Sequence, residues 1–138
     1  MDHSLDAAAL PGMKEATRLR HEALERSPLL ARLTSSQLSH SEYECVLRSM
    51  LGFHDVAESR LAQVSDRLPL DTSVRKKAHL AARDLRHLGM SPECIAAIPR
   101  CASIPEISSV DAALGLLYVL EGSTLGDARK VAGSVRYD

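Results

Sequence analysis

The chain has 138 residues, of which 45% are hydrophobic and 25% are charged, and its formal net charge is −1. This composition is typical of a soluble globular chain of single-domain size, and we expect one domain over residues 1–138. Both signs of charge are interspersed, which argues against nucleic acid and an acidic membrane as partners. No apolar run is long enough to span a membrane.

The three cysteines form no C-x-x-C pair, and their number is odd. This pattern argues against a disulfide framework and a thiolate zinc site, and it favours a reducing compartment. The segment from Met1 to Asp6 is acidic, whereas a secretory signal has a basic start followed by an apolar run. We therefore expect a cytoplasmic protein.

Apolar residues recur at spacings of three and four, which predicts an all-α fold. The first helix is expected over about Pro11–Arg26, and Pro28 ends it. After a loop from Thr34 to Ser41, a capping box of Ser41 and Glu44 is expected to open a second, long helix. Its apolar face continues for over six turns, until Pro69 stops it.

Two more long helices are predicted in the second half of the chain. The third begins near residue 72 or 73 and ends at Gly89, which is placed as a C-terminal cap. A short helical turn follows over residues 91–99. The fourth opens at Ser108, in a Ser-x-x-Asp pattern, and runs toward Val131.

Three basic residues of the first helix share one face, because Lys14, Arg18 and His21 are separated by four and three residues. Thr17 flanks the same face. A neutral imidazole near two cations suits haem, which needs an axial ligand for iron and positive groups for its propionates. A solvated basic helix edge with a half-buried histidine has the same spacing, and spacing alone favours that alternative.

Four glycines of the fourth helix lie on one line. Gly115, Gly122, Gly126 and Gly133 all fall within about 20° of that line on an ideal helix. Because a glycine inside a helix costs roughly 1 kcal/mol relative to alanine, the line needs a compensating reason. Either a flat ligand approaches the backbone here, or another helix packs tightly against it, and the spacing does not separate the two.

Other chemistry finds little support in the sequence. There is no Glu-x-x-His pair for a di-iron site and no nucleotide-binding or nucleophile-elbow motif. His54, on the long second helix, is expected to be a core histidine or to line the edge of a pocket rather than to act as a catalytic base.

Two segments carry a resemblance to a known family. Met13-Lys14-Glu15-Ala16-Thr17-Arg18-Leu19-Arg20-His21 resembles the opening helix of haem oxygenases. Leu116-Leu117-Tyr118-Val119-Leu120-Glu121-Gly122-Ser123-Thr124-Leu125-Gly126 resembles the distal helix of their bacterial branch, which supplies biliverdin to phytochromes. The motifs stand in the expected order, about a hundred residues apart, and the resemblance covers essentially the whole chain.

The resemblance implies a multi-helical haem-oxygenase-like bundle and assigns roles to residues. His21 would be the proximal ligand of the haem iron, and Lys14 and Arg18, with Thr17 beside them, would bind the propionate side. On the distal helix, space for dioxygen and weaker polar contacts would come from Gly122, Gly126, Glu121 and Ser123.

The implied activity is opening of haem by O₂ to biliverdin, iron and carbon monoxide, with haem as both cofactor and substrate. Electrons would come from a separate reductase or a ferredoxin, and a bacteriophytochrome could accept the biliverdin. The alternatives are a haem-binding or sequestering protein without turnover, and a helical interaction module that has lost haem.

Two departures from the family pattern bear on these expectations. Asp127 stands where the family usually has a second glycine after Gly126. Family members run to about two hundred residues, within the usual range of a domain, whereas this chain ends at Asp138. We therefore expect a bundle that is incomplete at its C-terminus, with a pocket that is open or completed by a second subunit in a homodimer.

Overall fold

The computed structural model describes the backbone of residues 9–33 and 35–134, and the side-chain surroundings of residues 11–33 and 35–122. Every regular element in these ranges is a helix, which confirms the predicted all-α class. In chain order they are α1 (Ala9–Glu25), α2 (Pro28–Arg32), α3 (His40–Ala62), η1 (Ser65–Arg67), η2 (Ser73–Arg75), α4 (Ala78–His87), α5 (Pro92–Ala96) and α6 (Val110–Ser134).

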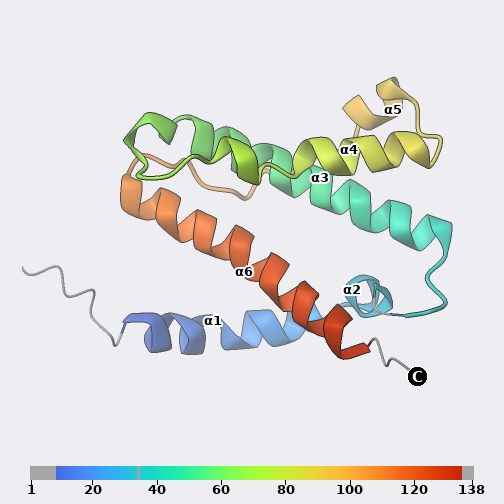
Figure 1. Cartoon of the computed structure of the whole chain (residues 1–138), viewed down its shortest axis with the longest axis horizontal. Helices are drawn as coiled ribbons and strands as arrows, with labels where there is room; N and C mark the ends of the chain where they lie inside the picture. The colour runs from blue at the N-terminus through green and yellow to red at the C-terminus, as the bar shows by residue number, and fades with distance from the viewer. Residues whose placement is uncertain (1–8, 34, 135–138) are drawn as a thin grey trace, which may run out of the picture.

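The most extensive contact between two helices joins α3 and α4, which lie side by side in the upper layer of Figure 1. Below them in that view, α6 crosses diagonally, and α1 lies along the lower edge. Among the described residues, no helix is both long and apolar enough to cross a membrane.

Helix α3 contributes to both apolar clusters of the core. In the α3–α6 cluster, the second half of α3 packs against the loop before α6 and against α6 itself, through Ala57, Leu61, Val64, Ile104, Ile107, Ala113, Leu117 and Leu120. In the α3–α4 cluster, the first half of α3 packs against α4 and α5, through Leu47, Leu51, Ala78, Ala81, Leu85, Ile95 and Ile98. Burial of each large aliphatic side chain stabilises the fold by about 1.5–3 kcal/mol.

The capping box of α3 lies two residues earlier than the sequence suggested. The Glu42 backbone N–H donates to Ser39 Oγ over 3.2 Å, and the Ser39 backbone N–H donates to Glu42 Oε2 over 2.8 Å. The predicted pair of Ser41 and Glu44 was wrong. Ser39 with Glu42 and Ser41 with Glu44 both match the Ser-x-x-Glu pattern, and the helix begins at His40, directly after the first serine. Hydrogen bonds from Ser39 and Arg32 lower the pKa of Glu42 to about 2.

Replacing Ser39 with Ala should destabilise the fold by about 1 kcal/mol, because the backbone N–H of Glu42 loses its acceptor and the Glu42 carboxylate loses the bond from the Ser39 hydroxyl. Ser41→Ala is the matched control, since Ser41 contributes a hydroxyl contact to Ser39 but no cap to the backbone. Urea unfolding followed by circular dichroism measures both. Equal losses in the two variants would contradict the assignment of the cap to Ser39.

Helix α4 begins later than predicted, at Ala78 rather than near residue 72. The Glu58 carboxylate of α3 explains this start, because its Oε1 accepts the backbone N–H of Lys77 at 2.6 Å and that of Ala78 at 3.0 Å. A carboxylate at this end also interacts favourably with the helix dipole. Val74, which falls within the range predicted for this helix, instead lies in η2 and is 80% exposed.

The two remaining long helices also differ slightly at their ends. Helix α3 stops at Ala62, and the chain continues through η1 instead of remaining α-helical to Pro69. At the start of α6, Ser109 rather than Ser108 accepts a backbone N–H, that of Ala112, at 3.1 Å.

Gly89 is confirmed as the C-terminal cap of α4. Its φ of 93° lies in the left-handed region that glycine adopts most readily. The N–H of Gly89 donates to the Arg86 carbonyl over 2.9 Å, and the N–H of Met90 donates to the Leu85 carbonyl over 3.1 Å. These bonds satisfy carbonyls at the end of the helix and direct the chain into α5.

The loop after α5 passes close to the middle of α3. The Cys101 backbone N–H donates to the Gly52 carbonyl over 3.0 Å. A Cβ at Gly52 would lie 2.5 Å from the Pro99 carbonyl oxygen, closer than real Cβ contacts come. Gly52 is therefore required where the loop crosses α3, a contact between residues far apart in the sequence.

Candidate functional site

The candidate ligand face of α1 is open to solvent. Lys14, Thr17, Arg18 and His21 are all exposed, as is every other residue between Pro11 and His21. The Thr17 hydroxyl donates to the Met13 carbonyl over 2.8 Å, so it is engaged by its own helix. The imidazole of His21 lies on the surface rather than half-buried, so this face is accessible to a large ligand.

Arg18 is held between two carboxylates of the same helix. Its Nη1 lies 2.9 Å from Glu22 Oε1, and its Nε lies 3.3 Å from Glu15 Oε2. Both pairs are solvent-exposed, and such pairs contribute only about 0–1 kcal/mol. A ligand carboxylate can therefore replace Glu22 at little cost. No described residue forms an ion pair with Lys14.

The glycine line of α6 faces open space where its surroundings are described. A Cβ built at Gly115 or Gly122 meets nothing within 4 Å, so tight helix packing does not account for these two glycines. Tyr118 and Val119, between them in sequence, are 48% and 56% exposed. The side-chain surroundings of Ser123 and Gly126, together with those of Gly133, lie outside the described residues.

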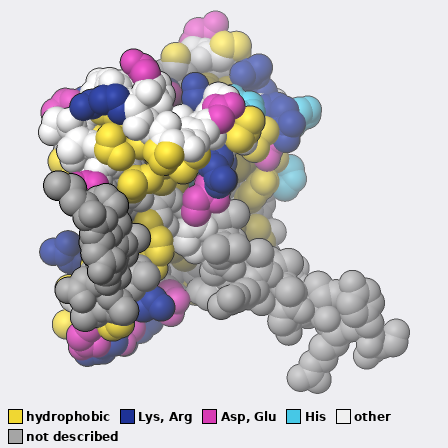
Figure 2. Space-filling view, turned by 60° about the vertical axis from the view of Figure 1, so that its left-hand side comes forward, with side chains coloured by type: hydrophobic (Ala, Val, Ile, Leu, Met, Phe, Trp, Pro, Cys, Tyr) yellow, Lys and Arg dark blue, Asp and Glu magenta, His cyan; other side chains and the backbone are white. Residues whose placement is uncertain are grey.

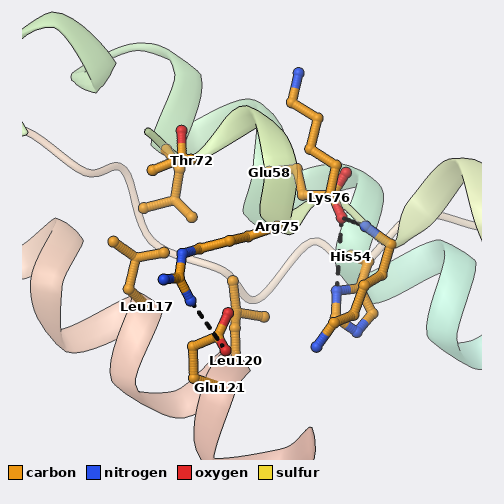
Figure 3. Close-up of a pocket in the computed structure, with 10 residues that line it drawn as sticks. His54, Glu58, Thr72, Arg75, Lys76, Leu117, Leu120 and Glu121 are labelled. Carbon is orange, nitrogen blue, oxygen red and sulfur yellow. Dashed lines mark hydrogen bonds and ion pairs between the residues drawn. The ribbon is translucent and has the colours of Figure 1, made fainter. Parts of the chain in front are cut away.

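Glu121 is directed toward η2. Its Oε2 lies 3.2 Å from Nη1 of Arg75, and Figure 3 shows the two side chains meeting at the edge of a cavity. This ion pair joins η2 to α6 immediately before Gly122. The pairing makes Glu121 a link between two elements, and the polar ligand contact that the family resemblance implies for it stays a prediction.

A small cavity behind Glu121 contains the chain's only described buried polar side chain, His54. Its volume is about 10 Å³, roughly enough for one water molecule. Lining residues come from α3, the segment before α4, and α6, namely His54, Glu58, Leu61, Thr72, Arg75, Lys76, Lys77, Leu117, Leu120 and Glu121. The prediction of a core histidine at a pocket edge is confirmed.

The environment of His54 disfavours its charged form. Burial lowers the pKa of His54 below its ordinary value of 6.5, and the positive charge of Lys77 lowers it further. The Glu58 carboxylate, with Oε1 3.7 Å from His54 Nδ1, acts in the opposite direction but does not outweigh burial. The spacing of His54 and Glu58, four residues apart on one helix, is a sequence signal from which this pair could have been predicted.

Because the pKa of His54 is lowered on folding, the unfolded chain takes up a proton more readily than the folded one. The free energy of unfolding should therefore decrease as the pH falls through 6.5, the ordinary value, and on toward the lowered pKa. Urea unfolding at several pH values between about 5 and 7.5 measures this slope. His54→Gln should flatten the slope, whereas the exposed His79→Gln should keep it. An unchanged slope in His54→Gln would contradict the assignment.

The structure does not unite the two candidate faces in one described cavity. A second, shallow cavity of about 270 Å³ is lined by polar residues between α3 and η2, including Asp66, Asp71 and Lys76. Neither of these two cavities includes a residue of α1 or a glycine of α6. His21 and Gly122 therefore both lie outside these two cavities, on exposed faces of α1 and α6.

Comparison with known proteins identifies the family. Residues 7–130 match the family described as Heme oxygenase, and this range includes both the opening-helix motif and the glycine-rich motif. No curated protein and no solved structure gives a significant match. Because the match extends over most of the 138 residues, the chain belongs to the haem oxygenase family.

Proposed function

We propose that the chain binds haem through His21 and, with O₂ and an external electron donor, converts it to biliverdin, iron and carbon monoxide. The observation that carries the proposal is the open face of α1, on which an exposed imidazole and two cations stand in the family's opening-helix motif. When bound, the haem supplies the iron that activates O₂ and the macrocycle that is oxidised.

The described residues fit a haem in three respects. The exposed imidazole of His21 can offer a neutral nitrogen to iron. Lys14 and Arg18, one to two turns away on the same face, can bind two propionates, Arg18 by exchanging Glu22 for a ligand carboxylate. The space beside Gly122 admits a flat molecule close to the helix backbone.

Each residue has a distinct task in this proposal. His21 binds and orients, the two cations set the direction of the propionates, and Gly122 with Gly126 keeps the opposite side free for O₂. Tyr118 and Val119 expose apolar surface next to Gly122, which would exclude water from the ligand's face. Arg75 holds Glu121 and so restrains α6 next to the same glycine.

We extend the proposal to location and partners. The protein would act in the cytoplasm, receive electrons from a reductase or ferredoxin, and pass biliverdin to a bacteriophytochrome, and two copies could complete an open pocket as a homodimer. Sedimentation velocity with and without hemin tests the last point. A single monomeric species in both conditions would contradict it.

Titration of the purified protein with hemin, followed by aerobic addition of a ferredoxin and its reductase, tests the function. The expected result is a shifted Soret band, which then disappears as biliverdin absorbance grows, with catalase present to remove free peroxide. A stable Soret band under these conditions would overturn turnover and leave a haem-binding protein. No shifted Soret band at all would overturn haem binding and leave a helical interaction module.

A further inference from the structure

Positive charge is concentrated in residues 75–87, a feature that the interspersed charges of the chain as a whole conceal. The segment Arg-Lys-Lys-Ala-His-Leu-Ala-Ala-Arg-Asp-Leu-Arg-His contains five Lys and Arg residues and one acid, a balance of +4. Because the whole chain carries −1, the remaining residues carry −5. This one segment therefore has the opposite sign to the rest of the molecule.

The cations of α4 lie on its solvent side. His79, Arg83 and Arg86 are offset by four and three residues, which places them within about 60° on a helix. All three are exposed, while the other side of α4 packs on α3 through the buried Ala81 and Leu85. We call His79, Arg83 and Arg86, together with the exposed Lys76 just before the helix, the α4 basic face. Dark blue and cyan side chains also gather at the upper right of Figure 2.

A smaller share of these cations has a carboxylate partner than of the described arginines elsewhere in the chain. Carboxylates pair with six described arginines outside this segment, in the pairs Arg18–Glu22, Arg26–Glu22, Arg32–Glu42, Arg48–Glu44, Arg60–Glu106 and Arg100–Asp55. On the α4 basic face, Arg83 reaches only the adjacent Asp84, with Nε 3.3 Å from Oδ1. No described residue forms an ion pair with Lys76 or Arg86. The positive charge of Lys76 lies near Asp71, whose pKa it helps to lower, so Arg86 is the cation of the face that no described carboxylate neutralises. The face thus keeps a net positive charge.

Two exposed apolar side chains lie in or next to the same segment of the chain. Leu80 follows His79 on α4 and is 38% exposed, and Val74 precedes the segment at 80% exposure. Protein interfaces combine apolar contact with charge complementarity, whereas phosphate backbones are bound mainly through charge. The helix is ten residues long, about 15 Å, which suits a local contact better than an extended polyanion.

We propose that the α4 basic face is a docking surface for the acidic surface of another protein. The complementary charges would steer the encounter, so the association should weaken strongly as salt rises. The apolar side chains Leu80 and Val74 would add contact area once the two surfaces meet. This inference does not depend on haem binding, because none of these residues belongs to the proposed haem site.

The test uses the full-length protein without haem, labelled with ¹⁵N, and three probes. These are an acidic peptide rich in Glu and Leu, a DNA duplex, and phosphatidylcholine vesicles containing phosphatidylserine. We expect the peptide to bind most tightly at low salt and its amide shifts to concentrate in residues 75–87. Tighter binding to DNA or to the vesicles, shifts centred elsewhere, or no binding of the peptide would each overturn the proposal.

Charge variants separate a specific surface from a general charge effect. The double variant R83E/R86E should weaken peptide binding at least about tenfold, because it reverses the centre of the face. R26E/R48E makes the same change in net charge on exposed positions of α1 and α3, and it should change the affinity less than about twofold. R83K/R86K should retain binding. Equal weakening in the two reversal variants would contradict a local docking surface.

Discussion

Replacing His21 with Ala is expected to abolish the axial bond to haem iron, so that the Soret band of the hemin-loaded protein moves toward that of free hemin. Alanine offers no ligand atom to the iron. The imidazole of His21 is exposed, so its removal leaves no cavity in the core and should hardly change the stability of the fold. Absorption spectroscopy therefore reports ligation rather than unfolding.

Two controls make the result specific to His21. His79→Ala removes another exposed histidine, on α4, and should leave the spectrum unchanged. Adding free imidazole at about 10 mM to the His21→Ala protein should restore the shifted band, because the small ligand can occupy the vacated position. If His21→Ala keeps the wild-type spectrum, another residue binds the iron and the proposed proximal role is wrong.

Gly52→Ala is expected to lower the free energy of unfolding by about 1–3 kcal/mol, the usual range for atoms forced into a close-packed site. The new Cβ would lie 2.5 Å from the carbonyl oxygen of Pro99, and backbone cannot rotate away as a side chain can. Either the loop moves, which strains the bond from the Cys101 N–H to the Gly52 carbonyl, or α3 bends. Urea unfolding followed by circular dichroism measures the loss.

Gly12→Ala is the matched control for this substitution. Gly12 lies in α1, and an added Cβ there meets nothing within 4 Å. The same change of residue should be neutral or stabilise the fold by up to about 1 kcal/mol, because alanine favours the helix. A loss of stability in Gly12→Ala as large as that in Gly52→Ala would show that the effect comes from helix propensity and not from the contact with Pro99.

Local patterns predicted the helices well and their ends less well. Periodicity found α1, α3 and α6 because each keeps a pattern over many turns. The start of α4 was wrong because it depends on Glu58, a residue of another helix that the pattern around Thr72 does not reveal. The contact of Gly52 with Pro99 was missed for the same reason, since it joins residues 47 positions apart.

Some features of the candidate site could likewise be predicted from local patterns, and others could not. The motifs around His21 and Gly122 predicted the family, which the match over residues 7–130 confirms. Burial of His54 followed from its register on the long apolar face of α3. Pairing of Glu121 with Arg75 could not be predicted, because it requires the path of the chain between α3 and α4.

The central position of helix α3 affects the order in which parts of the fold unfold locally. This helix is shared by the α3–α6 cluster and the α3–α4 cluster, so either cluster can loosen while the other still holds part of α3. Backbone amides exchange with deuterium only when their hydrogen bonds open, and the most protected ones report global unfolding. The amides of Leu51 to Leu61 should therefore exchange most slowly, and those of the exposed α1 much faster, in a hydrogen-exchange experiment on the haem-free protein.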